Sequence, residues 1–245
     1  MASRYWVGGS ASWNGTAGTK WATTSGGSGG AAVPTSSDDV YFDASSGSAL
    51  VIVDTIATRY ARSITFTSFT GTFSASSSGG SPLEISRDLT FSSPGMAFNY
   101  NAGFKFTPNA ATGTIIGDSK LIGNNDLEIV ATGGGTIVIN DQCTFKNVTL
   151  SQGTLSIGAG VIVFVTNFTA SGLYATTIKS TSSGVQGVLY KSSGTVTVSN
   201  VSIQDNNATG GAVWDASNGT NTNLGNNTGW VFPAVATGNV FMQFF

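Results

Sequence analysis

The chain has 245 residues, of which only 9% are charged and 40% are hydrophobic, and its formal net charge is −2. Disordered chains combine low hydrophobicity with high net charge, so this composition excludes disorder and predicts a folded protein. The ten Lys and Arg residues are scattered and form no basic stripe, so nucleic acid is not an expected partner.

The chain begins Met1-Ala2-Ser3-Arg4 and lacks the apolar segment of a signal peptide. No run approaches the roughly 18 apolar residues of a membrane helix. We therefore expect synthesis in a cytoplasm, no export by a cleaved signal and no membrane partner.

Residues 1–47 form a first region that is rich in Trp and Gly. Trp6, Trp13 and Trp21 lie here, together with the Gly- and Ser-rich stretch 25–30. The terminal units of a repeat stack need atypical capping elements, and large aromatic side chains suit that purpose. The alternative is that these tryptophans form an exposed docking surface or platforms on which sugars stack.

The densest carboxylate group of the chain is Asp38, Asp39 and Asp43. Carboxylates in a loop can bind calcium, but these residues lack the spacing and the central Gly of an EF-hand loop. We favour a role in a turn or at the entry to a strand.

Residues 48–204 form a second region in which helix signals are almost absent. Short β-branched or aromatic runs bounded by turn residues predict many strands. The expected strands are 50–53, 63–66, 83–85, 89–91, 104–106, 114–116, 127–130, 136–139, 148–150, 155–157, 161–168, 188–190, 196–198 and 201–203.

A short phrase, Asn-apolar-hydroxyl followed by an apolar or small residue, recurs at Asn147, Asn167 and Asn200. Asn147 and Asn167 are 20 residues apart, close to one turn of a β-helix. The longer step to Asn200 requires an inserted loop, which we place around residues 180–184. Inward-facing Asn side chains at one corner of successive turns would form a hydrogen-bonded ladder, because buried amides need partners.

These features predict an all-β fold, a right-handed parallel β-helix (β-solenoid) with Trp-rich capping segments. A β-sandwich also produces short strands every 8–12 residues or so. Because the spacing is irregular before residue 113, a β-sandwich N-terminal half followed by a β-helix stays open as the alternative.

The residues needed for common enzyme chemistry are scarce. Histidine is absent, which excludes a Ser-His-Asp triad and the usual zinc ligand. Cys143 is the only cysteine, and a buried structural thiol is its expected state. Asp126 and Glu128 alternate around Leu127 and would face one side of a strand, where a solvated surface is a simpler interpretation than a catalytic pair. We expect no enzyme activity, no cofactor and no metal.

Residues 205–245 form a third region, which is rich in Asn and Gly and contains Trp214 and Trp230. Its last six residues, 240–245, carry no side-chain charge and would be an aggregation liability if exposed. Either this tail packs back on its own domain, or it docks onto a neighbouring subunit, and the low charge of the chain favours docking. The candidate attachment residues are therefore the five tryptophans and Phe241, Phe244 and Phe245.

Two stretches resemble a module of structural proteins of tailed bacteriophages. The first runs from Arg4-Tyr5-Trp6-Val7-Gly8-Gly9 to Val33-Pro34-Thr35-Ser36 and Asp38-Asp39-Val40-Tyr41-Phe42-Asp43. The second runs from Ala208-Thr209-Gly210-Gly211-Ala212 to Asn226-Asn227-Thr228-Gly229-Trp230-Val231-Phe232. Together they cover about a third of the chain. The resemblance implies a β-rich virion protein and carries over no catalytic residues.

From these observations we expect a non-enzymatic capsid decoration protein or small head spike, located in the virion. Its expected partners are further copies of itself in a homotrimer and the major capsid protein or other virion proteins. A tail fibre that recognises host surface glycans through Trp13 and Trp214 is the first alternative. A glycan depolymerase that uses Asp126 and Glu128 is the second.

Overall fold

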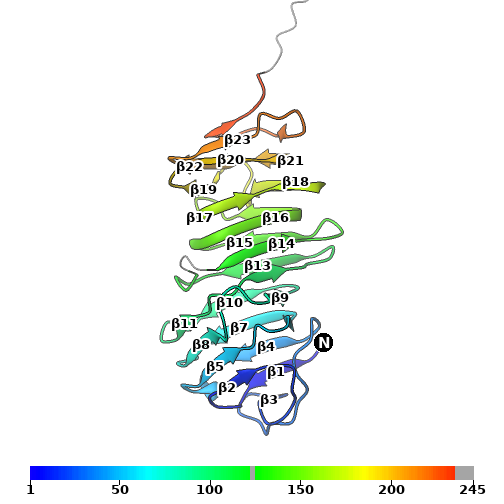
Figure 1. The fold of residues 1–245 in the computed structure, drawn as a ribbon, viewed down its shortest axis with the longest axis vertical. Coiled ribbons are helices and arrows are strands. Elements are labelled where there is room, and N and C mark those ends of the chain that lie inside the picture. Colours follow the sequence, from blue (N-terminus) through cyan, green and yellow to red (C-terminus); the bar gives the residue numbers. More distant parts are fainter. Residues whose placement is uncertain (122–124, 235–245) are drawn as a thin grey trace, which may run out of the picture.

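The computed structural model describes residues 1–121 and 125–234, and it is all-β, with 52% strand and 1% helix. The chain winds into a β-solenoid of about eight turns, which confirms the expected parallel β-helix. Figure 1 shows the turns stacked along the long axis, with the N-terminal strands at one end and the C-terminal strands at the other.

The strands lie on three faces of the coil. Face A contains β1 (Ser3–Trp6), β4 (Asp39–Phe42), β7 (Ser63–Thr67), β10 (Leu89–Ser92), β13 (Thr112–Ile116), β15 (Thr136–Ile139), the second half of β16 (Cys143–Ile157), β18 (Ser171–Ser180), β21 (Ser199–Gln204) and β24 (Thr222–Asn223). Face B contains β2 (Ala11–Trp13), β5 (Leu50–Val53), β8 (Thr72–Ala75) and β11 (Ala97–Asn99).

Face C contains β6 (Arg59–Ala61), β9 (Leu83–Ile85), β12 (Phe104–Phe106), β14 (Asp126–Val130), the first half of β16, β17 (Ile162–Thr169), β19 (Gly187–Lys191) and β22 (Asn206–Gly210). A separate sheet near the C-terminal end contains β20 (Thr195–Thr197), β23 (Val213–Asp215) and β25 (Trp230–Val231). The remaining elements are β3 (Trp21–Ala22) and a short 3₁₀ helix, η1 (Ala44–Ser46).

The first half of the chain is stacked in the same way as the second. β4 pairs with β7 and β7 with β10, both in parallel, and β5, β8 and β11 form a second parallel ladder. The antiparallel pairing of β1 with β3 is an addition at the N-terminal end. A β-sandwich requires antiparallel sheets packed face to face, so the alternative of a sandwich N-terminal half is wrong.

Register alignment places like residues above one another in the core. On face A, Val40 pairs with Ile64, Ile64 with Leu89, Leu89 with Ile115 and Ile115 with Ile139, and all five side chains are buried. Each step takes 24 to 26 residues along the chain. Because successive side chains of a strand point to opposite sides, the side chains on one side of each strand fill the core and those on the other side point to solvent.

An aromatic column runs beside this aliphatic one. The rings of Phe42, Phe66 and Phe91 stack with centroids 4.9 Å apart at both steps and with interplanar angles of 13° and 6°. Stacked rings at this separation add to the free energy gained from burying them. This column belongs to β4, β7 and β10, so it links three successive turns.

Strands from all three sequence regions stack on one another. β1 and β4, from residues 1–47, pair with each other, and β4 also pairs with β7. β22, from residues 205–245, pairs with β19. Within the described part of the chain, no helix is long and apolar enough to cross a membrane.

Candidate functional site

The three N-terminal tryptophans form a closed cluster inside the first turn. Trp21 packs edge-on against Trp6 at 5.0 Å and against Trp13 at 5.2 Å between ring centroids. All three side chains are completely buried, and Trp6 donates its indole N–H to Gly9 O at 2.9 Å. The cluster covers the end of the Phe42 column, since each of the three rings also lies near Phe42.

The two C-terminal tryptophans occupy the last turns in a similar way. Trp214 and Trp230 pack edge-on at 5.2 Å, and Trp230 donates to the buried Asn206 Oδ1 at 2.8 Å. Phe168, from an earlier turn, packs against Trp214 with ring centroids 6.0 Å apart. Burial is what a capping role requires, whereas a docking surface or a sugar platform must be exposed.

The interpretation of the five tryptophans as exposed attachment or sugar-stacking residues is therefore wrong for the chain as described. The remaining attachment candidates, Phe241, Phe244 and Phe245, lie outside the described residues, as does the whole of the tail 240–245.

Asn147 and Asn167 are joined in a ladder on face C. Asn167 Nδ2 donates to Asn147 Oδ1 at 2.8 Å, and Asn147 Nδ2 donates to Asp126 Oδ1 at 2.7 Å. The register aligns the same residues, with Asp126 opposite Asn147 and Asn147 opposite Asn167. A carboxylate only accepts hydrogen bonds, so Asp126 sets the direction of both amides.

The ladder differs from the expected one in two respects. It lies on the solvent side of face C and not inside the core, because Val148, the neighbour of Asn147, is the residue that points inward. Asn200 is not a member: it lies on β21 of face A, has a φ of 57° and donates Nδ2 to Gly172 O at 3.0 Å. The step from Asn167 to Asn200 is thus not one turn of the repeat.

An open groove of about 680 Å³ runs over the ladder. Its floor is the outer side of face C, where Glu128 pairs with Thr149 and Thr149 with Thr169, beside the row of Asp126, Asn147 and Asn167. Its walls include the loop before β9 and the loop before β12, which contribute residues 78–80, 82, 101 and 103. Lys146 borders the groove and is exposed.

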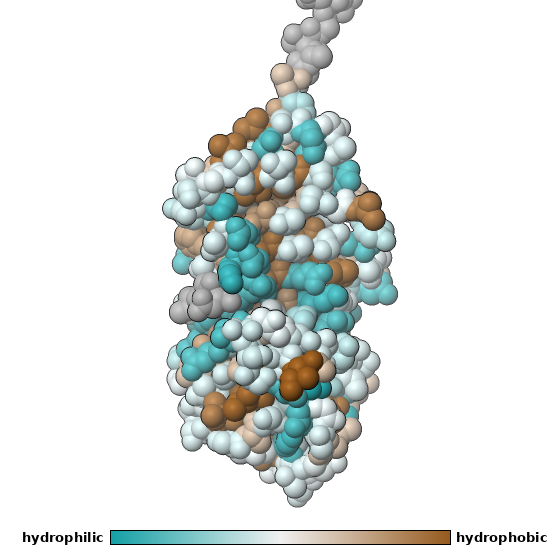
Figure 2. All heavy atoms as spheres, in the orientation of Figure 1, coloured by the Kyte–Doolittle hydropathy of each residue, from teal (hydrophilic) through white to brown (hydrophobic). Residues whose placement is uncertain are grey.

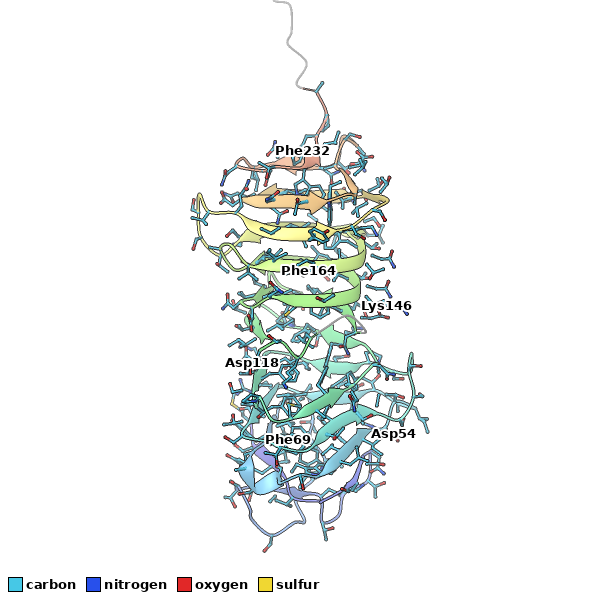
Figure 3. The ribbon with its side chains drawn as sticks, turned by 90° about the vertical axis from the view of Figure 1, so that its left-hand side faces the viewer. Asp54, Phe69, Asp118, Lys146, Phe164 and Phe232 are labelled. Atoms are coloured by element: carbon cyan, nitrogen blue, oxygen red, sulfur yellow. The ribbon has the colours of Figure 1, made fainter. Side chains whose placement is uncertain are left out.

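Two views show the surroundings of the groove. In Figure 2, hydrophilic residues gather around the middle turns of the solenoid. In Figure 3, Lys146 projects from the side of the coil in the same middle part. The sequence indicated that Asp126 and Glu128 share one side of a strand, which the structure confirms. The sequence did not indicate the residues of the groove walls, because their position beside face C depends on how the loops of earlier turns fold.

The carboxylates Asp38, Asp39 and Asp43 do not converge on one point. Asp38 accepts hydrogen bonds from Thr35 and Ala2, Asp39 pairs with Arg62, and Asp43 caps η1 by accepting from Ser45 N and Ser46 N. Within the described residues, no group of three or more His, Cys, Asp or Glu side chains could hold a metal ion.

Cys143 is buried on β16, in agreement with a structural thiol. Burial raises the pKa of Cys143 to about 12, and the nearby charge of Asp141 adds to this. The thiolate is the reactive form of cysteine, so this side chain is not a candidate nucleophile.

Comparison of the chain with protein-family models, with curated proteins and with solved structures found no match.

Proposed function

We propose that this protein is a non-enzymatic structural component of a tailed-bacteriophage particle, a capsid decoration protein or small head spike. The observation that carries the proposal is the continuous solenoid core, which is covered by buried tryptophans at each end. Stacked turns joined by parallel ladders resist local opening, and a short rod of this kind suits a mechanical role.

The phage-like motifs coincide with the two covers. The first motif contributes β4 and β1, which includes the buried Trp6, and the second contributes β25 with Trp230. This placement supports the view that the chain is a solenoid module of the kind the resemblance implies.

The proposal includes a homotrimer that is attached to the major capsid protein or another virion protein. The low content of charged residues supports assembly, since a nearly neutral surface gives little electrostatic protection against association. We propose that the apolar segment 240–245 makes the attachment.

The direct test is quantitative mass spectrometry of purified particles of the phage that encodes the chain. A decoration protein should be present in many copies, in a fixed ratio to the major capsid protein. Absence from the particle would refute a virion role. A few copies per particle would contradict a capsid location and favour the tail.

A deletion of residues 240–245 separates attachment from folding. The shortened protein should keep the melting temperature and oligomeric mass of the full chain but disappear from purified particles. A fall in melting temperature would mean that the segment is part of the folded core, and the docking proposal would fail. Light scattering of the full chain should give three times its 24.9 kDa mass.

A further inference from the structure

We propose that the groove on face C binds a linear, neutral oligosaccharide along the solenoid axis. This inference goes beyond the structural role and does not depend on it. The groove volume of about 680 Å³ lies in the usual range for small-molecule sites, roughly 300–1,000 Å³.

The floor of the groove carries two rows of hydrogen-bonding side chains at the spacing of the strands, each row beginning with a carboxylate. One row is Asp126, Asn147 and Asn167, and the parallel row is Glu128, Thr149 and Thr169. Neighbouring strands are about 4.8 Å apart. A chain of sugars also presents hydroxyls repeatedly along one axis, and each hydroxyl both donates and accepts a hydrogen bond.

The ladder leaves hydrogen-bonding capacity directed at the groove. Asn147 and Asn167 each use one amide N–H within the ladder, and each NH₂ group carries two. The hydroxyls of Thr149 and Thr169 make no side-chain hydrogen bond to another described residue and line the groove. These groups suit a ligand that hydrogen-bonds through many weak, neutral contacts.

The charges around the groove favour a neutral ligand over an anionic polymer. Asp126 and Glu128 place two carboxylates on the floor, and Lys146 places one ammonium at the border. A polyphosphate or nucleic acid would meet the two carboxylates directly, which like-charge repulsion opposes.

The positions of the two carboxylates favour binding over cleavage. A glycosidase of the lysozyme type places its general acid in an apolar pocket. Asp126 is exposed and accepts the amide of Asn147, while Glu128 is only half-buried.

The floor presents no exposed aromatic ring, since Phe104, the aromatic residue that lines the groove, is 2% exposed. Affinity must therefore build up from hydrogen bonds along the ladder and should rise with ligand length until the groove is filled. The rigid strands reduce the ordering cost of binding.

The test begins with an array of bacterial-surface oligosaccharides probed with the labelled full chain, followed by calorimetry on the positive oligosaccharides. Thr149→Trp fills the groove from an outward strand position, and Asn147→Ala interrupts the ladder. Each should weaken binding at least tenfold. Thr65→Trp on the outside of face A and Asn99→Ala on β11 are the matched controls and should stay within twofold.

Circular dichroism and melting temperature establish that each variant is folded before its affinity is compared. The proposal is overturned by the absence of any array signal, or by equal weakening in the control variants. It is also overturned if calcium alone binds with the same dependence on Asn147 and Thr149, which would indicate a cation site. Release of new reducing ends from a bound oligosaccharide would show that the protein hydrolyses its ligand and would contradict binding without cleavage.

Discussion

Asp38 joins the start of the chain to the first turn of the solenoid. Its carboxylate accepts from Thr35 N at 3.0 Å, from Thr35 Oγ1 at 2.8 Å and from Ala2 N at 3.2 Å, and Arg4 lies at 3.7 Å. Burial alone would raise the pKa of Asp38, but the Thr35 hydrogen bonds, the Arg4 charge and the Ala2 amide outweigh it, so the pKa is lowered.

The lowered pKa of Asp38 predicts a specific pH dependence of stability. A group whose pKa is lower in the folded state stabilises the fold above its unfolded pKa, here about 3.8, and this contribution is lost as pH falls through the folded value. Asp38→Asn should therefore lower the melting temperature at pH 7 and have a much smaller effect at pH 2.

The measurement is thermal unfolding of both proteins across that pH range. Asp118→Asn, at an exposed carboxylate, is the control and should not change the pH dependence. An equal loss of melting temperature at pH 7 and pH 2 in Asp38→Asn would show that the carboxylate charge is not what stabilises this site.

The last turns of the solenoid are held by asparagine side chains that bond to the main chain. Asn221 Nδ2 donates to Val198 O at 2.8 Å, Asn227 Nδ2 to Ile203 O at 2.8 Å and Asn206 Nδ2 to Gly187 O at 3.0 Å. Each bond reaches about one turn back along the chain. Side-chain amides thus add hydrogen bonds to main-chain carbonyl groups of the preceding turn.

Gly229 sets the close approach of the final strand. Its φ is 76°, and a Cβ at this position would lie 1.7 Å from Ala208 O. Gly229→Ala must move β25 and the Trp230 ring away from β22, in addition to adopting a φ that L-residues avoid. We expect a loss of more than about 1 kcal/mol in the free energy of unfolding.

Chemical denaturation monitored by tryptophan fluorescence measures this loss. Gly219→Ala is the matched control, because a Cβ there meets no atom within 4 Å. Similar stabilities for the two variants would mean that the approach of Gly229 to Ala208 is not a constraint on the last turn.

The whole molecule is a one-dimensional stack in which each turn contacts mainly its neighbours. Face A carries one column of aliphatic residues and one of aromatic residues through the first turns, and tryptophans cover the core at each end. In such a stack, stability is close to a sum of contributions from turns and from the interfaces between them, and the terminal units keep the core from water.

Removal of the C-terminal cover should therefore change the association state before it changes the fold. A chain ending at Gly210 lacks Trp214 and Trp230, which exposes Phe168 and the end of the core. We expect this truncated chain to keep the circular dichroism spectrum of a β-sheet protein. We also expect it to form oligomers with more subunits than those of the full chain.

Size-exclusion chromatography with light scattering checks the outcome. A chain ending at Ala234 keeps the cover and should form oligomers with the same number of subunits as the full chain at equal concentration. If the chain ending at Gly210 forms oligomers with the same number of subunits as that control, Trp214 and Trp230 do not protect the core against association.

Much of the strand pattern could be predicted locally. The runs at 50–53, 83–85 and 104–106 are strands with those bounds, because short β-branched or apolar-rich runs between turn residues suffice to define a strand. The regularity of the first half could not be predicted, since parallel partners come from turns more than 20 residues away and the phrase that marks later turns is weak there.

The sequence by itself determined that the chain is all-β, that its units must stack, and that Asn147 and Asn167 lie one turn apart, because these follow from side-chain alternation and spacing. Only the tertiary structure decided that the ladder faces solvent, that Asp126 belongs to it and Asn200 does not, and that the tryptophans are inside. The physical reason is that register and the direction of each turn decide which face a residue occupies. A shift of one residue moves a side chain from core to surface.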